Sequence, residues 1–464
     1  MKNILTTVKN VLPLILIAAS FSSSFAQKAE KGWTKLFDGK SLEGWKQMAG
    51  DANYKVEKGQ ILGTSTAVLN SGNSFLVYEK EYADFVLELD VKVESTLSNS
   101  GVQVRSHYDP AANKGKGRVF GRQIEIDPST RKWSGGIYDE GRRDWLYPMT
   151  LNSTAQDAFK VGEFNHLKIE CIGNEMKTWV NGIPCGYVVD TLDQSGFIAL
   201  QMHGITNAEG ANKKVYFKDI RIKTSNLQPT PFPKGVYVVN KTPNALSDYE
   251  KQDGWRLLFD GETSKGWKGA YKKTFPEKGW TAKNGLLTVL AAEGKESTNG
   301  GDIVSEEQFK SFDLSFEFKI TPGANSGVKY FVTLSENNPG SAIGLEYQVL
   351  DDERHPDAKL GRDGNRTLGS LYDLMAAKKE NRFIRAPGQW NTGRVVVYPD
   401  NSVEHYLNGI KVLSYVRGSK EYRDLVALSK YTPFKNFGEA TSGHILIQDH
   451  GNLVSYRSIK IKAL

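Results

Sequence analysis

The chain has 464 residues, a length that suggests two ordinary domains or one large one. Its 39% hydrophobic and 24% charged residues describe a globular protein and exclude a largely disordered one. The formal net charge of +7 is spread along the chain without a Lys/Arg block, which argues against a nucleic-acid-binding protein.

The N-terminus is typical of a secretory signal peptide. Lys2 and Lys9 form a basic region, residues 11–19 form an apolar run, and residues 24–26 (SFA) supply small side chains at a cleavage site. We expect cleavage after Ala26 and a mature protein in the periplasm or outside the cell. The apolar run is too short to span a bilayer, and no later stretch is suited to a transmembrane helix.

The rest of the chain repeats itself. The opening motif GWTKLFDG at residues 32–39 returns as GWRLLFDG at residues 254–261. Later landmarks recur in the same order: Asn99–Val102 with Asn325–Val328, Gly136–Asp139 with Ser370–Asp373, Val180–Ile183 with Leu407–Ile410, and Leu200–Gly204 with Ile447–Gly451. A repeat of this length indicates tandem domains, here residues 30–223 and 254–464. The Pro-containing linker 224–253 is expected to be semi-rigid, with the strand-like residues 236–239 packing on one domain.

Short alternating segments dominate both halves. Residues 85–93 and 312–320 alternate cleanly between apolar and polar side chains, as half-buried strands do. Helical patterns are confined to residues 422–429 and, more weakly, 155–159. Many antiparallel strands with few helices predict an all-β protein of two tandem jelly-roll β-sandwich domains.

The two cysteines lie in a predicted three-stranded meander. Cys171 is on its first strand and Cys185 on its third, so two strand spacings, roughly 10 Å, separate them. The Cα atoms of a disulfide lie within about 7 Å. We therefore expect two free, buried thiols without a catalytic role.

Residues 121–145 of the first domain combine a polar strand face with a charged loop. Gln123, Glu125 and Asp127 alternate with apolar side chains, and a loop containing Tyr138, Asp139 and Arg142 follows, with Trp133 and Trp145 as aromatic walls. An amide and two carboxylates beside aromatic and guanidinium groups suit a polyol-binding or acid/base site. The competing interpretation is a solvated outer strand with a charged loop.

Strand parity predicts that further polar groups join this face. Gln103 and Arg105 share one face of their strand, and Gln201 and His203 share one face of theirs. If these strands are neighbours, they form a polar, concave floor whose paired donors and acceptors suit the hydroxyls of a sugar.

The second domain carries a variant of the same floor. Lys329 and Phe331 stand where the first domain has Gln103 and Arg105, Glu346 and Gln348 exchange the order of acid and amide, and Gln448 and His450 repeat Gln201 and His203. His355 adds a second imidazole, and Tyr372 repeats Tyr138. A histidine at a strand end is usually structural, but two at equivalent places favour a functional role. Asp351 and Asp352 are weak candidates for a divalent cation, because no EF-hand or zinc spacing supports them; no other cofactor is predicted.

The motifs GW-x-x-LFDG at each domain start, NSGV, GLEYQVLDDERHPD, SLYDL, LNG and IQDHG resemble those of the 3-keto-disaccharide hydrolase family. This family is also described as 3-keto-glucoside 1,2-lyase and 3-keto-2-hydroxy-glucal hydratase. The resemblance covers nearly all of the mature chain as two copies. It implies a concanavalin A-like jelly roll that acts on glycosides already oxidised at C3, with a small molecule or oligosaccharide as substrate.

The implied chemistry assigns roles to the floor residues. A ketone at C3 acidifies the proton on C2, a base removes that proton, the C1 aglycone leaves, and water adds to the resulting glucal, so the net reaction is hydrolysis. We expect His450 as base, Lys329 or Gln448 at the enolate oxygen, and Glu346 as acid. The first-domain counterparts are His203, Arg105 or Gln201, and Glu125. Gln348, His355, Asp351, Gln103, Gln123 and Asp127 are expected to contact substrate, together with Tyr372, Tyr138, Asp139 and Arg142.

Two other functions stay open at this point. A non-catalytic, lectin-like protein would use its tandem domains for avidity toward a polysaccharide, and a surface-interaction protein would bind no sugar. A conventional glycosidase with two paired carboxylates is less attractive, because the second-domain floor offers one clear carboxylate and the Asp351-Asp352 pair lies beyond it. The exchanged acid and amide leave open whether both domains catalyse.

Overall fold

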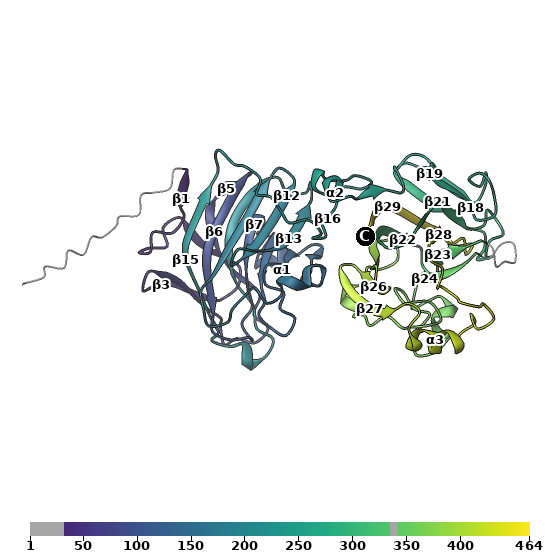
Figure 1. Cartoon of the computed structure of the whole chain (residues 1–464). Helices are drawn as coiled ribbons and strands as arrows, with labels where there is room; N and C mark the ends of the chain where they lie inside the picture. Colours follow the sequence, from purple (N-terminus) through teal and green to yellow (C-terminus); the bar gives the residue numbers. More distant parts are fainter. Residues whose placement is uncertain (1–31, 335–341) are drawn as a thin grey trace, which may run out of the picture.

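The computed structural model describes residues 32–334 and 342–464, so the predicted signal peptide lies outside the described residues. Four β-sheets form two sandwiches that lie side by side (Figure 1). None of the helices in the described ranges is long and apolar enough to cross a membrane. The all-β, jelly-roll-like fold class is thereby confirmed.

The first sandwich pairs a nine-stranded and a seven-stranded sheet. The larger sheet contains β1 (Trp33–Lys35), β3 (Asn53–Glu57), β4 (Gln60–Thr64), β6 (Phe85–Val93), β11 (Asn165–Ile172), β12 (Glu175–Val180), β13 (Ile183–Val189), β15 (Lys214–Lys223) and β16 (Val239–Asn240). The smaller sheet, in the order β10-β9-β8-β7-β14-β5-β2, contains β2 (Trp45–Met48), β5 (Ser74–Tyr82), β7 (Ser100–Asp109), β8 (Arg118–Ile126), β9 (Ile137–Glu140), β10 (Asp144–Tyr147) and β14 (Gly196–Met202).

The second sandwich pairs an eight-stranded and a five-stranded sheet. The larger sheet contains β17 (Arg256–Leu257), β19 (Trp280–Lys283), β20 (Leu286–Val289), β22 (Phe312–Ile320), β25 (Asn391–Val397), β26 (Ser402–Leu407), β27 (Ile410–Val416) and β29 (Val454–Ala463). The smaller sheet, in the order β18-β21-β28-β23-β24, contains β18 (Trp267–Gly269), β21 (Ile303–Phe309), β23 (Asn325–Thr333), β24 (Ile343–Leu350) and β28 (Gly443–Ile447).

Helices are few and short in the described part of the chain. They are α1 (Ala112–Gly115), α2 (Asp248–Gln252), α3 (Lys420–Ala427) and the 3₁₀ turns η1 (Met149–Ala155), η2 (Ala208–Gly210), η3 (Pro356–Lys359) and η4 (Asn381–Phe383). The helix predicted near residues 422–429 is confirmed as α3, which begins after its N-cap Ser419. The helix predicted at 155–159 is wrong. Its backbone forms only single turns, such as the one closed by the hydrogen bond from the Ala158 N–H to the Ala155 carbonyl, and no series of α-helical hydrogen bonds.

The two strands predicted from clean alternation are confirmed with the same bounds, as β6 and β22. Each buries its apolar residues in the core between the sheets of its own sandwich; examples are Leu87 and Leu89 in the first and Phe316 and Phe318 in the second. Periodicity is a local property of the sequence, so it identified these strands without knowledge of their partners.

The segment 224–253 is attached to both sandwiches. Residues 239–240 form β16, which pairs in parallel with β13, and Val238 packs with Trp179 and Tyr187. The predicted packing of this segment on a sandwich is therefore correct. From α2, the buried Glu250 carboxylate accepts a hydrogen bond from the Lys460 ammonium on β29 of the second sandwich.

The sandwiches also touch directly. The Phe383 ring lies 5.9 Å from that of Trp133, and the Arg385 guanidinium donates to the Asp144 carboxylate at 2.8 Å. Phe383 belongs to the same hydrophobic cluster as the first-sandwich core. The two sandwiches therefore share a packed contact in addition to the connecting segment.

The cysteine prediction is confirmed. Cys171 on β11 and Cys185 on β13 are free and buried, with β12 between them. Burial raises the pKa of each thiol to about 12, which leaves both unreactive at neutral pH.

Candidate functional site

A cavity of about 280 Å³ opens over the smaller sheet of the second sandwich. Lys329 on β23 lies directly opposite Glu346 on β24 in the antiparallel register, so both side chains project from the same face. Gln348 shares that face of β24, and Gln448 and His450 follow β28 on the other side of β23. All five line the cavity, as the alternation of the sequence predicted.

The glycine of the NSGV motif makes room for the Glu346 side chain. A Cβ added at Gly327 would lie 2.2 Å from Oε1 of Glu346, closer than any real Cβ contact. The first sandwich repeats this feature, because a Cβ at Gly101 would lie 2.4 Å from Cδ of Gln123. The glycine of the motif therefore leaves the space that the side chain on the neighbouring strand occupies. This side chain is the acid Glu346 in the second sandwich and the amide Gln123 in the first.

Several lining residues were missed by the sequence analysis: Glu296, Asn325, Lys430, Tyr431 and Phe434. Asn325 belongs to a motif that the repeat had marked, and its Oδ1 has no hydrogen-bond partner among the described residues. The other four lie in loops without a recognisable counterpart in the first half, so neither parity nor the repeat identified them.

Charge in the cavity is divided between two lysines and several acids. Burial works against the charge of Lys329, but Glu346, Asp302 and Glu296 together hold its pKa above the ordinary value. Burial raises the pKa of Glu346, and the nearby Lys329 and Lys430 offset this only in part. Burial likewise raises the pKa of Asp302, which lies 3.9 Å from the Lys329 ammonium, to about 6. A cation thus lies beside a carboxyl that favours its protonated form.

Two further polar atoms at the cavity, in addition to Oδ1 of Asn325, lack a partner within the described ranges. Nε2 of Gln448 donates to Glu296 at 3.2 Å, but its buried Oε1 has no hydrogen-bond partner among the described residues, and neither has Nδ1 of His450. Buried polar groups are normally paired, so these two atoms are available to a ligand or to water.

His355 and Tyr372 lie around this floor. The His355 ring packs against the His450 ring with centroids 5.6 Å apart, while its Nδ1 accepts from the Asp357 backbone N–H. The Tyr372 hydroxyl donates to the Asp357 carboxylate at 2.8 Å. Tyr372 lines the cavity, whereas His355 supports His450 from outside it.

The expectations for Asp351 and Asp352 are corrected. Asp351 accepts from the Gly323 backbone N–H and pairs with Arg354, and Asp352 caps the Leu368 N–H and pairs with Lys379. Neither lines the cavity. Within the described ranges, no group of three or more His, Cys, Asp or Glu side chains is arranged to hold a metal ion.

The first-sandwich floor is assembled as predicted but is closed. In the register, Gln103 lies opposite Gln123 and Gln201 opposite Gly101, so β14, β7 and β8 are neighbours with their polar groups on one face. Gln103 and Gln201 are 0% exposed, and Glu125 is 4% exposed. The competing interpretation of this strand as a solvated outer strand is therefore wrong.

A chain of hydrogen bonds connects these buried groups. Gln103 donates to Gln123, Gln123 donates to Oε2 of Glu125 at 2.9 Å, and Asn99 donates to Oε1 at 2.8 Å. Burial raises the pKa of Glu125 to about 7. Both polar atoms of the Gln201 amide lack a partner among the described residues.

Arg105 does not belong to the floor. A β-bulge interrupts the pairing of β7 between Val104 and His107, and Arg105 has a left-handed backbone with φ of 46°. Its side chain points away and donates to the backbone oxygens of Ala83 and Gly173 and to Asp84. Phe331, its counterpart, has φ of 52° at an equivalent bulge.

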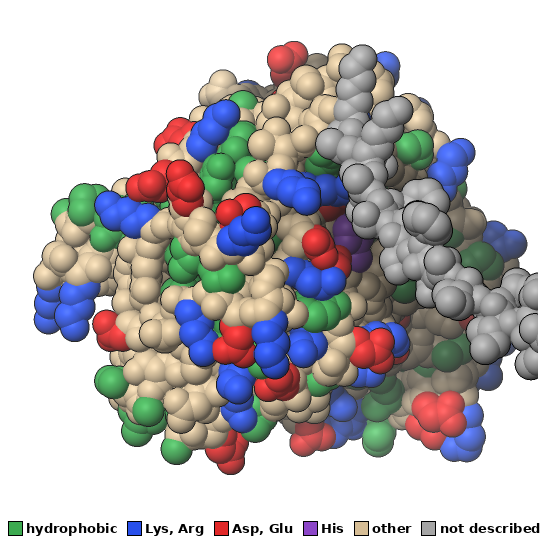
Figure 2. Space-filling view, turned by 90° about the vertical axis from the view of Figure 1, so that its left-hand side faces the viewer, with side chains coloured by type: hydrophobic (Ala, Val, Ile, Leu, Met, Phe, Trp, Pro, Cys, Tyr) green, Lys and Arg blue, Asp and Glu red, His purple; other side chains and the backbone are tan. Residues whose placement is uncertain are grey.

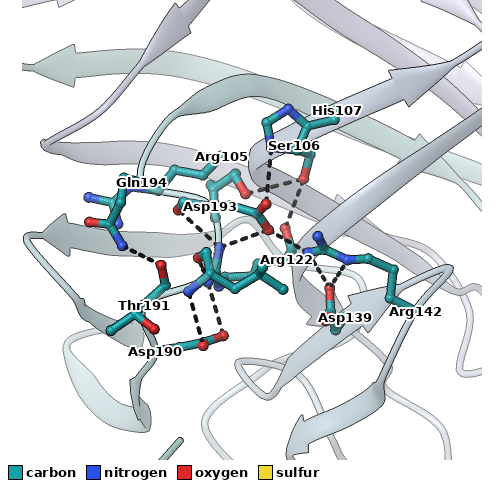
Figure 3. A network of polar contacts seen from close by, with 12 residues as sticks. Arg105, Ser106, His107, Arg122, Asp139, Arg142, Asp190, Thr191, Asp193 and Gln194 are labelled. Carbon is teal, nitrogen blue, oxygen red and sulfur yellow. Dashed lines mark hydrogen bonds and ion pairs between the residues drawn. The ribbon is translucent and has the colours of Figure 1, made fainter. Parts of the chain in front are cut away.

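Asp139 and Arg142 also lie elsewhere, in a network of ion pairs (Figure 3). Asp139 is opposite Arg122 in the register, which places it on the face away from Gln123. It accepts from Arg142 at 2.7 Å, and Arg142 and Arg122 both pair with Asp193. These predicted substrate contacts are therefore corrected to structural ion pairs.

Asp127 and Tyr138 are tied locally as well. The Asp127 carboxylate accepts from the Ser129 N–H and pairs with Arg131 at 2.6 Å. Tyr138 is on the Gln123 side of β9, and its hydroxyl donates to Asp144 at 3.2 Å.

His203 lines a separate cavity of about 210 Å³ together with Asn99. Gln103, Gln123 and Glu125 are not among its lining residues. Desolvation lowers the pKa of His203, although its Nδ1 lies 2.5 Å from the Gly204 carbonyl oxygen. Figure 2 shows the molecule from the left-hand side of Figure 1, with side chains of both charges interspersed on that face.

A further cavity, of about 250 Å³, lies where the two sandwiches meet. Its aromatic lining includes Trp145 and Trp390. Its cationic groups are already paired within the protein: Arg394 with Asp313, Arg385 with Asp144 and Lys460 with Glu250. It therefore offers fewer free polar groups than the cavity over β23 and β24.

Comparison with known families agrees with the repeat. The model of the 3-keto-alpha-glucoside-1,2-lyase-like domain matches residues 32–223 and again residues 254–462. The chain belongs to this family. Both copies of the repeat are members, so the differences between the two floors are differences within one family.

The chain is also similar to individual known proteins. The chain is 36% identical over 233 residues to a 3-keto-disaccharide hydrolase of Bacteroides thetaiotaomicron, covering 46% of this chain and 79% of that protein. Among solved structures, it is similar to a putative glycosyl hydrolase from Parabacteroides distasonis, with 30% identity, a TM-score of 0.42, and coverage of 48% of this chain and 100% of that one. A second putative glycosyl hydrolase from the same organism shares 24% identity, with a TM-score of 0.35 and coverage of 45% and 99%.

Proposed function

We propose that the second sandwich cleaves glycosides whose sugar is already oxidised to a ketone at C3. The observation that carries this proposal is the convergence of a histidine, a lysine and a carboxyl with raised pKa in one cavity, His450, Lys329 and Glu346. These are the groups that removal of a C2 proton, stabilisation of an enolate and protonation of a leaving group require. Family membership and the name of the Bacteroides relative support the same substrate class.

In the proposed reaction, His450 removes the proton on C2, and the electron pair moves toward the C3 oxygen. Nδ1 of His450 has no partner among the described residues, so the imidazole is free to accept a proton. The ring of His355 packs at its side and limits its rotation.

Negative charge then develops on the C3 oxygen. The ammonium of Lys329 is held by acids around it and stays cationic, as the stabilisation of an enolate oxygen requires. The Nε2 group of Gln448 is a second candidate donor, although it already donates to Glu296.

The bond between C1 and the aglycone oxygen breaks as the enolate collapses, and the departing oxygen needs a proton. Glu346 suits this role, because burial raises the pKa of its carboxyl above the ordinary value and so increases the fraction that carries a proton. Addition of water across the resulting glucal completes a net hydrolysis. The signal-like N-terminus supports an exported location for this activity.

Proton NMR of the protein with a 3-keto-glucoside in D₂O tests the proposal. The expected result is release of the aglycone with deuterium at C2 of the freed sugar, or a transient glucal. Intact substrate without C2 exchange, across several aglycones, would contradict it and favour a lectin-like binding protein, which glycan binding assays would then examine.

A further inference from the structure

The two sandwiches differ most in the segment that precedes the last strand of the smaller sheet. In the first sandwich, residues 190–195 connect β13 to β14, whereas in the second, residues 417–442 connect β27 to β28. The longer segment contains α3 and brings Lys430, Tyr431 and Phe434 to the wall of the cavity. The first sandwich has no counterpart to these three side chains.

The longer segment is held firmly against the sandwich. The buried ring of Tyr422 on α3 stacks on Tyr415 at 5.8 Å, and its hydroxyl donates to the Phe437 carbonyl. Next to the cavity, the backbone N–H of Lys430 donates to Asp373 at 2.8 Å. Asp373 is in turn fixed by the Arg366 guanidinium at 2.7 Å. These contacts fix the point from which the Lys430 side chain extends.

The Lys430 ammonium lies over an aromatic ring and near Glu346, without forming a close ion pair. It is 4.3 Å from the centroid of the Tyr372 ring, and no carboxylate of the described chain lies within ion-pair distance of it. By contrast, the Lys379 ammonium, on another wall of the same sandwich, forms an ion pair with Asp352 at 2.8 Å. Partial desolvation lowers the pKa of Lys430. An ammonium beside a cavity that is not held in a close ion pair is available to negative charge that forms there.

We propose that Lys430 is a further catalytic residue of the second sandwich, whose ammonium joins Lys329 in stabilising the enolate formed at C3. This inference rests on the proposed function. The two lysines line the same cavity from two different elements, β23 and the segment that follows α3, and both act on Glu346 there, so an anion in this cavity is within reach of two cations. The first-sandwich floor offers neither, because Gln103 occupies the position of Lys329 and the short connection carries no lysine. Turnover is therefore confined to the second sandwich.

The test compares three variants of the full mature chain on a 3-keto-glucoside. Lys430→Met removes the charge and keeps most of the side-chain volume, Lys430→Arg keeps the charge, and Lys435→Met is a matched control in the same segment. We expect kcat of Lys430→Met to fall about 10²-fold with little change in KM, because the charge acts on the transition state. Lys430→Arg should recover at least about tenfold of that loss, and Lys435→Met should match the parent protein.

Two results would overturn the inference. One is a Lys430→Met protein within about threefold of the parent kcat; the other is a Lys430→Arg protein no more active than Lys430→Met, which would assign Lys430 a packing role. Lys430 is an exposed residue, so its replacement should leave the fold intact, and thermal unfolding of each variant verifies this. Absence of turnover in the parent protein would instead contradict the proposed function itself.

Discussion

Replacing Gly327 with alanine tests the site through a single methyl group. The new Cβ would lie 2.2 Å from Oε1 and 2.8 Å from Cδ of Glu346. Ordinary van der Waals contact begins near 3.4 Å, so the carboxyl must move by about 1 Å. A misplacement of that size costs about 10²-fold in rate, or about 2.7 kcal/mol of transition-state stabilisation. We expect kcat/KM on a 3-keto-glucoside to fall by about this factor.

Gly101 provides the matched control, because it occupies the same motif in the first sandwich. A Cβ there would lie 2.4 Å from Cδ of Gln123, so Gly101→Ala introduces comparable crowding away from the second-sandwich cavity. Each variant should lose about 1–3 kcal/mol of stability from overpacking. Only Gly327→Ala should lose activity. Equal losses in two folded variants, or a fully active Gly327→Ala protein, would refute the assignment of Glu346.

Three further predictions concern His450 in the second sandwich and Glu125 and Arg105 in the first. His450→Ala should lower kcat about 10²–10⁴-fold while substrate binding, measured by calorimetry, persists; retained turnover would exclude His450 as the base. Glu125 has a folded-state pKa of about 7 against an ordinary value of 4.5, so between these values the folded chain keeps a proton that the unfolded chain releases, and this group's contribution to stability falls as pH rises. Denaturant unfolding should show about 3 kcal/mol of this loss between pH 4.5 and 7 in the parent and none of it in Glu125→Gln; equal pH profiles would contradict the raised pKa. Arg105→Met should cost about 2–3 kcal/mol of stability, since three hydrogen bonds are lost, and leave KM unchanged, whereas a raised KM would return Arg105 to the site.

Much of the fold could be predicted because it depends on local features. Alternation alone gave β6 and β22 with their bounds, since a strand in a sandwich must turn one face to the core. The two-residue spacing also placed Glu346 and Gln348 on one face of their strand. The repeat then allowed each motif of one half to be matched to its counterpart in the other, because both halves adopt the same fold.

Where the prediction was wrong, a non-local cause is responsible. Alternation assumes an uninterrupted strand, but the bulge in β7 turned Arg105 away from Gln103, and nothing in the residues around it signals a left-handed arginine. The same assumption made Gln103 and Glu125 appear solvated, whereas the packing around them excludes water. The charged loop between β9 and β10 forms ion pairs because two acids distant in sequence lie beside its arginines. Asp190 pairs with Arg143, and Asp193 pairs with Arg142.

The sequence by itself determined the repeat, the β-sandwich class, the free cysteines and the polar residues of the second-sandwich floor. All of these follow from local periodicity, spacing and motif order, which do not depend on how distant segments meet. Only the tertiary structure decided which floor is open and which is closed, and that Lys430 reaches the open one. Burial and convergence are set by contacts between residues far apart in the chain, such as Lys430 with Tyr372, and no local pattern encodes them.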